Sequence, residues 1–213
     1  DVDKAVAGAM IAKMRNGGAA CTAANRFYVH DSLVNEFAKK FAAALSLIKV
    51  GPGIDPVNDL GAMVSEKEAK KILDLIDQAA AAGGEVITTA SAPSAGAYVA
   101  PVVVRGVEHG SILTREEVFG PVAPIVTFSD KAEGIRMAND TEYGLISYVY
   151  AKDAGEGIAV ARQMESGMVA INRGVASDPA APFGGMKQSG LGREGGFHGI
   201  HEFLEPQYFA VDL

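Results

Sequence analysis

Cys21 is the residue of this sequence with the most distinctive chemistry, because it is the only cysteine among 213 residues. It lies within RNGGAACTAANR (15–26), after a Gly-Gly pair and before a polar Asn-Arg pair. If the glycines form a turn and residues 23–26 a short helical segment, free backbone N–H groups point at the sulfur and favour the nucleophilic thiolate. A lone cysteine is also commonly a small buried hydrophobic residue. The segment alone leaves both interpretations open.

Histidines decide whether Cys21 belongs to a cysteine hydrolase, since that class needs an imidazole base beside the thiol. The four candidates are His30, His109, His198 and His201, and none lies in a local pattern typical of such enzymes. His198 and His201 have a spacing seen in metal sites. Without an HExxH pattern or a further ligand cluster, we interpret them as surface helix residues and expect no metal site.

Gly190, Gly192 and Gly195 formally match the GxGxxG pattern of dinucleotide-binding turns. Such a turn follows directly from a hydrophobic strand and precedes an acidic residue about 20 positions later. No hydrophobic strand runs into these glycines, and the sequence ends at residue 213. We therefore interpret them as a junction between a loop and a helix.

Composition excludes several classes of partner. The formal net charge is −7 and no basic stripe is present, which argues against nucleic acid. No apolar run reaches the roughly 18 to 20 residues that span a bilayer. One cysteine cannot form an internal disulfide, so a reducing, cytoplasmic location is expected. The sequence shows no signal peptide, and it begins with Asp1 in what reads as the middle of a helix, which indicates a fragment of a longer protein.

Helices and strands alternate along the chain. One helix is predicted from the spacing of Val6, Met10 and Met14, and others are predicted to begin after the capping residues Asp31, Ser65, Asp130 and Asp153. Strands are predicted at 26–30, 85–90, 100–107, 122–128, 146–151 and 167–172. This alternation predicts an α/β fold with a mostly parallel twisted sheet and helices on both faces. A long irregular stretch, 173–192, is expected to be functional or disordered.

Three further segments complete a family pattern: TREEVFGPVAP (114–124), NDTEYGL (139–145) and PFGGMKQSGLGRE (182–194). Together with the Cys21 segment, in this order and at these separations, they resemble the catalytic domain of the NAD(P)-dependent aldehyde dehydrogenases. The resemblance runs from about residue 3 to the end of the chain. It implies the fold of that domain and a requirement for NAD or NADP.

The resemblance also implies roles for single residues. Cys21 matches the nucleophile that adds to the aldehyde carbon, and its backbone N–H matches half of an oxyanion hole. Glu117 matches the carboxylate that binds the nicotinamide ribose, and Phe119 matches the aromatic residue beside the nicotinamide ring. Arg15 and Ser177 match the positions that bind the distal carboxylate in succinate-semialdehyde dehydrogenases, the branch that this sequence resembles most.

Departures from the family pattern limit what the chain does alone. The family's Gly-Gln-Thr before the cysteine is Gly18-Ala19-Ala20 here, and the second cysteine of some relatives is replaced by Ala23. The dinucleotide-binding half, the general-base glutamate and the oxyanion asparagine of the family lie upstream of the matched region. We therefore expect a fragment that is inactive by itself.

The expected organisation is a catalytic domain over 1–205 and an oligomerisation tail strand over 206–213, with a homo-oligomer for the full-length enzyme. The expected substrate is succinate semialdehyde. Two alternatives stay open: a dehydrogenase for glutarate semialdehyde or an uncharged aliphatic aldehyde, and a stand-alone binding or assembly module without activity.

Overall fold

The largest sheet of the fold has four strands in the order β1-β4-β3-β2. Its strands are β1 (Phe27–His30), β2 (Glu85–Thr88), β3 (Val102–Arg105) and β4 (Val122–Phe128). β1 and β3 run parallel to β4, whereas β2 pairs antiparallel with β3. This computed structural model describes residues 1–88 and 90–213, so residue 89 of the predicted strand 85–90 lies outside the described residues.

Helices cover both faces of the sheet, as the sequence predicts. Successive side chains of a strand point to opposite faces, so Val103 packs with one group of helices and Val104 with the other. The first group is α1 (Val2–Met14) and α2 (Val34–Leu45). The second group consists of α3 (Glu66–Ala81), the short α4 (Ile112–Arg115) and α5 (Lys131–Asn139). The α/β fold class is therefore confirmed.

Short polar side chains cap the N-termini of three helices where the sequence predicts them. Ser65 accepts a hydrogen bond from the N–H of Glu68, and Asp130 and Asp153 cap α5 and α6 (Ala154–Ala161) in the same way. The predicted cap at Asp31 is wrong. Residues 31–33 form a turn closed by the Leu33 N–H on the His30 carbonyl, and α2 begins after Leu33 without a side-chain cap.

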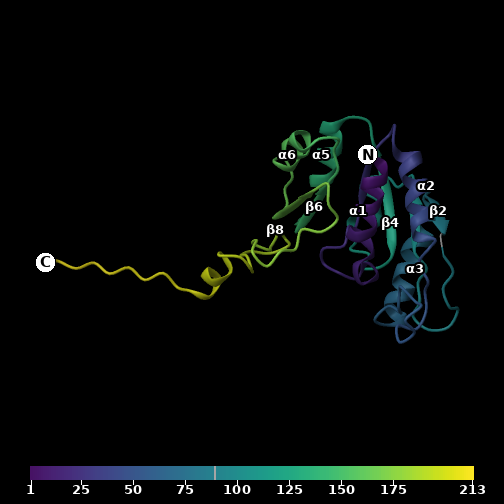
Figure 1. Ribbon diagram of the computed structural model, residues 1–213, viewed down its shortest axis with the longest axis horizontal. Helices are drawn as coiled ribbons and strands as arrows, with labels where there is room; N and C mark the ends of the chain where they lie inside the picture. The colour runs from purple at the N-terminus through teal and green to yellow at the C-terminus, as the bar shows by residue number, and fades with distance from the viewer. Residues whose placement is uncertain (89) are drawn as a thin grey trace.

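Two smaller strand pairs lie outside the four-stranded sheet. β6 (Ile146–Val149) pairs parallel with β7 (Met168–Ile171), and α6 contacts both strands. β5 (Tyr143–Gly144) pairs antiparallel with β8 (Met186–Lys187), which falls inside the predicted irregular stretch 173–192. Figure 1 shows strand β4 of the largest sheet beside α1, apart from β6 and β8. The six strands that the sequence predicts therefore occur, but they are divided between two sheets, and the third sheet, β5-β8, was not predicted.

The C-terminal segment projects away from the rest of the molecule (Figure 1). A 3-10 helix, η2 (Gly199–Phe203), is followed by residues 204–213 without regular secondary structure. Residues 206–213 are all exposed, and within the described part of the chain they pair with no strand. The tail strand expected there stays a prediction.

A membrane-spanning helix is not among the elements found: none of the described helices is both long and apolar enough to cross a bilayer.

Candidate active site

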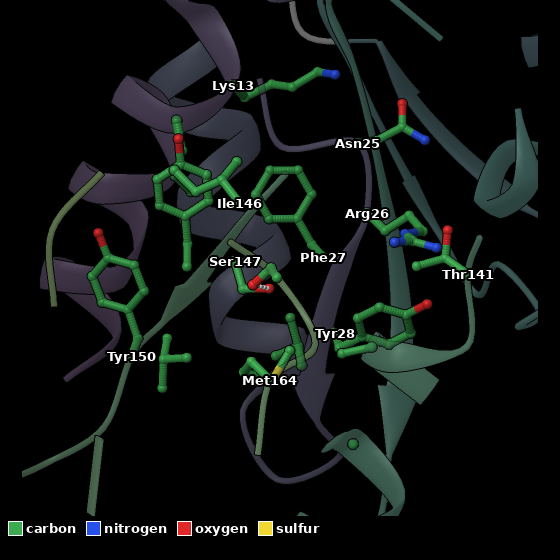
Figure 2. A pocket seen from close by; sticks show the side chains of 18 of the residues that line it. Lys13, Asn25, Arg26, Phe27, Tyr28, Thr141, Ile146, Ser147, Tyr150 and Met164 are labelled. Atoms are coloured by element: carbon green, nitrogen blue, oxygen red, sulfur yellow. Dashed lines mark hydrogen bonds between the residues drawn. The ribbon is translucent and has the colours of Figure 1, made fainter. Parts of the chain in front are cut away.

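A cavity of about 1230 Å³ is lined by both β1 and β6, although these strands belong to different sheets. Figure 2 shows Phe27 and Tyr28 from β1 and Ile146 and Ser147 from β6 around it. Three of the predicted site residues line the same cavity: Cys21, Glu117 and Phe119. The fold thus brings together the two segments, about 95 residues apart in the chain, that the family resemblance assigns to nucleophile and cofactor.

Cys21 is a free and exposed cysteine in a tight turn. The turn is closed by the Ala23 N–H on the Ala20 carbonyl (2.8 Å), and the Ala24 N–H donates to the Ala12 carbonyl in α1 (2.9 Å). The interpretation of Cys21 as a buried structural thiol is therefore wrong. The predicted helical segment over 23–26 is also wrong, because Ala23 forms a bend and residues 24–26 have no regular secondary structure before β1.

Gly18, the second of two glycines, places this turn against the segment that carries Phe119. The 3-10 turn η1 (Arg15–Gly18) follows α1, and Gly17 and Gly18 have φ of +61° and +82°. A Cβ on Gly18 would lie 2.2 Å from the carbonyl oxygen of Gly120. Glycine is required at position 18 both by its left-handed backbone and by this close approach. The Gly-Gly turn predicted from the sequence is confirmed.

Glu117 and Phe119 are presented by an irregular segment between α4 and β4. Both side chains are exposed, Phe119 by 44%. Phe119 has φ +51°, a left-handed conformation that is uncommon for an aromatic residue. Glu116 is also exposed, and its backbone carbonyl accepts a hydrogen bond from Asn25. The exposed side chain of Glu117 lines the cavity.

Tyr148 of β6 holds the Cys21 turn through a hydrogen bond to the backbone. Its hydroxyl, from β6, donates to the carbonyl oxygen of Thr22 at 2.8 Å. Burial raises the pKa of Tyr148, and the nearby Arg15 guanidinium opposes that shift. The tyrosine therefore remains a neutral hydrogen-bond donor around pH 7.

Arg15 and Ser177 are exposed and do not line the main cavity. Arg15 follows the last residue of α1, close enough to Tyr148 to act on its charge. Ser177 lies three residues after Gly174, where a Cβ would meet the Gly8 carbonyl of α1 at 2.3 Å. The loop with Ser177 thus crosses α1, the helix that Arg15 ends, but no direct contact between the two side chains is seen in the described residues.

Lys13 is a residue of this region that the sequence analysis missed. Only 1% of its surface is exposed, and it lines the cavity from the last turn of α1 (Figure 2). Burial lowers the pKa of Lys13 to about 7, and the negative charge of Glu117 partly counteracts this shift. Lys13 shares the buried face of α1 with Val6, Ala9 and Ala12. A lysine on an apolar helix face was the signal available in the sequence.

No histidine accompanies Cys21 as a base among the hydrogen bonds of residues 1–88 and 90–213. His109 is held by Tyr28 at 3.1 Å and by Asp140 at 2.8 Å, while His30 bonds to Ser32. His198 and His201 are exposed and pack against Phe197, as expected for surface positions; they flank or lie in η2. In the described part of the chain, no group of three His, Cys, Asp or Glu side chains could hold a metal ion.

The glycines of the GxGxxG match lie between β8 and η2, with positive φ at Gly190, Gly192 and Gly195. The interpretation as a loop-to-helix junction is confirmed, since irregular backbone leads there into the 3-10 helix.

Comparisons with known proteins identify the family of the chain. A sequence model of the aldehyde dehydrogenase family matches residues 1–209. A succinate-semialdehyde dehydrogenase of Paenarthrobacter nicotinovorans is 46% identical over 213 residues, which cover 99% of this chain and 47% of that protein. A glutarate-semialdehyde dehydrogenase of Pseudomonas putida is 42% identical, with 100% of this chain and 44% of that protein covered.

A solved structure has the same fold. The crystal structure of an E. coli NADP-dependent enzyme superposes with a TM-score of 0.95 at 40% identity, covering 100% of this chain and 44% of that one. The chain spans less than half the length of the relatives it matches.

Proposed function

This chain belongs to the aldehyde dehydrogenase family, and we propose on that basis that it is the catalytic part of an enzyme that oxidises an aldehyde to a carboxylic acid. The observation that carries the proposal is Cys21, a free exposed thiol on the same cavity as Glu117 and Phe119. A non-catalytic binding or assembly module would need no exposed thiol at this place.

In the proposed reaction Cys21 acts as a covalent nucleophile. Its thiolate adds to the aldehyde carbon and forms a thiohemiacetal, whose oxyanion accepts a hydrogen bond from the Cys21 backbone N–H. Loss of hydride from that carbon leaves a thioester on Cys21. Water then hydrolyses the thioester, which releases the acid and restores the thiol. The structure provides the exposed turn that this sequence of steps requires.

NAD or NADP, when bound, supplies the acceptor for that hydride. The residues present are suited to such a group, because an exposed carboxylate and an exposed aromatic ring lie two residues apart on the cavity. We propose that Glu117 accepts hydrogen bonds from ribose hydroxyls and that Phe119 contacts the nicotinamide ring. The backbone around them is held by hydrogen bonds to Asn25 and by the close approach of Gly18 to Gly120.

Succinate semialdehyde is the proposed substrate, with its carboxylate bound by Arg15 and Ser177. Support comes from the exposed guanidinium beside the Cys21 turn and from the 46% identical relative named for that substrate. Glutarate semialdehyde is the second candidate. The 42% identical relative is named for that aldehyde, whose carbon chain is one carbon longer than that of succinate semialdehyde.

The complete enzyme is proposed to have more than this chain. Residues 1–205 form the catalytic domain and 206–213 an oligomerisation strand that pairs with another subunit. An upstream segment supplies the dinucleotide-binding half, the general base and the oxyanion asparagine. A homo-oligomer in the cytoplasm is part of this proposal, and the unpaired thiol of Cys21 fits a reducing compartment.

The test is turnover by the full-length protein and its Cys21→Ala variant. We expect NADH or NADPH to form from succinate semialdehyde with the wild type, and a loss of at least 1,000-fold in kcat without the thiol. A variant that retains turnover would exclude Cys21 as the nucleophile. Iodoacetamide should also label Cys21 of the native protein at pH 7, and labelling only after denaturation would contradict its accessibility.

A further inference from the structure

Asn25 makes two hydrogen bonds that enclose one residue of a distant segment. Its Nδ2 donates to the carbonyl oxygen of Glu116 at 2.8 Å, and its Oδ1 accepts from the N–H of Val118 at 3.0 Å. These two partners flank Glu117. The Asn25 amide therefore pairs with the peptide groups on both sides of Glu117, in the way that one peptide group pairs with another.

A second contact joins the same two segments three residues before Cys21. There the backbone of Gly18 lies against the carbonyl of Gly120, with no room for a Cβ. On the first segment, Cys21 lies between Gly18 and Asn25. On the second segment, Glu117 lies between Glu116, which Asn25 contacts, and Gly120, which Gly18 contacts. The thiol and the carboxylate are thus carried by two segments fastened to each other on either side of both residues.

The backbone conformation of Phe119 indicates that these contacts hold the segment against its intrinsic preference for negative φ. Its φ of +51° lies in the left-handed region, where an aromatic residue stays only if the surrounding contacts enforce it. The Asn25 bond holds the N–H of Val118, the residue just before Phe119, and the Gly18 contact holds Gly120, the residue just after it. Without Asn25, one of these two constraints is lost.

From this geometry, and resting on the function proposed above, we propose that Asn25 is a positioning residue: it fixes Glu117 relative to Cys21 so that the carboxylate meets the cofactor ribose. Asn25 acts through the Glu117 backbone, so its removal should weaken cofactor binding and leave the chemistry of the thiol unchanged. This separates it from a residue that only stabilises the fold.

Asn25→Asp is the informative substitution, because it keeps the size and the acceptor for Val118 but puts an oxygen where Nδ2 donates to Glu116. A matched control exists in Asn139, whose Nδ2 donates to the Gln163 carbonyl at 2.7 Å and whose Oδ1 accepts from the Glu165 N–H at 2.9 Å. Asn139→Asp makes the same chemical change around Met164 instead of Glu117.

In the full-length protein, we expect Asn25→Asp to raise the KM for NAD or NADP about 5- to 30-fold, the effect of losing one well-placed hydrogen bond. The aldehyde KM and the rate of Cys21 alkylation should stay within about twofold of wild type. Asn139→Asp should leave the cofactor KM within about twofold. An unchanged cofactor KM in Asn25→Asp overturns the inference, as does a parallel change in all three quantities.

A second measurement on the 213-residue chain does not depend on turnover. In Asn25→Ala the Val118 amide should exchange with deuterium at least tenfold faster than in wild type, while helix α2 keeps its protection. Unchanged exchange at Val118 overturns the proposed fixing of Glu117, and this result also decides the question if Asn25→Asp does not fold. If the full-length wild type does not oxidise the aldehyde, the proposed function is overturned. If the wild type is active and the Asn25→Asp variant has an unchanged cofactor KM, only this inference is overturned.

Discussion

Lys13 places an ionisable amine in an almost fully buried position, and this has a consequence for stability. Burial lowers the pKa of Lys13 to about 7 in the folded chain, whereas an unfolded lysine titrates near 10.5. Below pH 7 the amine is charged in both states, and the folded chain carries the full desolvation penalty. Between pH 7 and 10.5 the unfolded state binds the extra proton, so stability rises with pH in this window.

We expect Lys13→Met to remove this pH dependence. Methionine has a similar length and no charge, so the variant should be more stable than wild type at pH 7 by several kcal/mol, on the order of 5 at most. The measurement is urea unfolding of both chains at pH 6, 7, 8 and 9. Equal pH slopes for wild type and variant would show that Lys13 is not responsible.

Arg15 and Ser177 are the residues that decide the substrate in our proposal. A hydrogen bond to a charged group contributes about 1.5 to 3 kcal/mol, and an arginine fork suits a carboxylate. Arg15→Ala should therefore raise the KM for succinate semialdehyde tenfold to a hundredfold, and Ser177→Ala less. Butanal, which lacks the carboxylate, should hardly respond to either change. Steady-state kinetics with both aldehydes in the full-length protein make this comparison.

The geometry offers one clear alternative for Arg15. It acts on Tyr148, and Tyr148 holds the Thr22 carbonyl next to Cys21. Equal losses with succinate semialdehyde and with butanal would mean that Arg15 supports the nucleophile turn through Tyr148. The carboxylate specificity would then have to be given up.

Turns and helix ends, at the scale of single elements, decide where the thiol lies. Two glycines with positive φ allow a test of how the turn before Cys21 is positioned. Gly18 has φ +82° and lies against the Gly120 carbonyl. Gly83, after α3, has φ +95°, and a Cβ there would meet nothing within 4 Å. Gly83→Ala should cost about 1 to 2 kcal/mol from backbone strain alone. Gly18→Ala adds a backbone clash and should cost more, and it should also change the alkylation rate of Cys21.

Urea unfolding and iodoacetamide kinetics on the two alanine variants separate these effects. The Gly83→Ala chain should alkylate at the wild-type rate, because a Cβ at Gly83 meets no other atom within 4 Å. If Gly18→Ala is no less stable than Gly83→Ala and labels normally, the close approach to Gly120 does not position the turn.

At the scale of the whole molecule, the C-terminal segment extends away from the rest of the chain (Figure 1). Large apolar side chains along it are exposed: Phe203, Leu204, Tyr208, Phe209 and Val211. A run of apolar residues that stays exposed within the described part of the chain favours burial against another subunit.

We therefore expect the full-length protein to form a dimer or a larger oligomer, and deletion of 206–213 to shift it towards monomer. The reason is that the tail contributes apolar area only when a second subunit covers it. Light scattering of both forms checks this. A full-length protein that is monomeric at micromolar concentration, or a deletion that leaves the oligomer intact, would contradict it.

Local features of the sequence predicted much of the fold. The alternation of helices and strands gave the α/β class, Ser65, Asp130 and Asp153 marked three helix starts, and the Gly-Gly pair marked the turn before Cys21. These features depend on hydrogen bonds between residues two to four positions apart and on the side-chain period of each element. The assignments of Cys21, Glu117, Phe119, Arg15 and Ser177 came from resemblance to a family and stay predictions.

Tertiary structure alone decided how these elements hold the site. Asn25 reaches a segment 91 residues away, and Tyr148 reaches the carbonyl of Thr22 across 126 residues. The burial of Lys13 likewise depends on what packs around α1. An amide, a phenol or an amine has no periodic signature in a sequence, because its partner is chosen by the approach of elements far apart in the chain. The sequence determined which residues could react; packing determined which residues hold them in place.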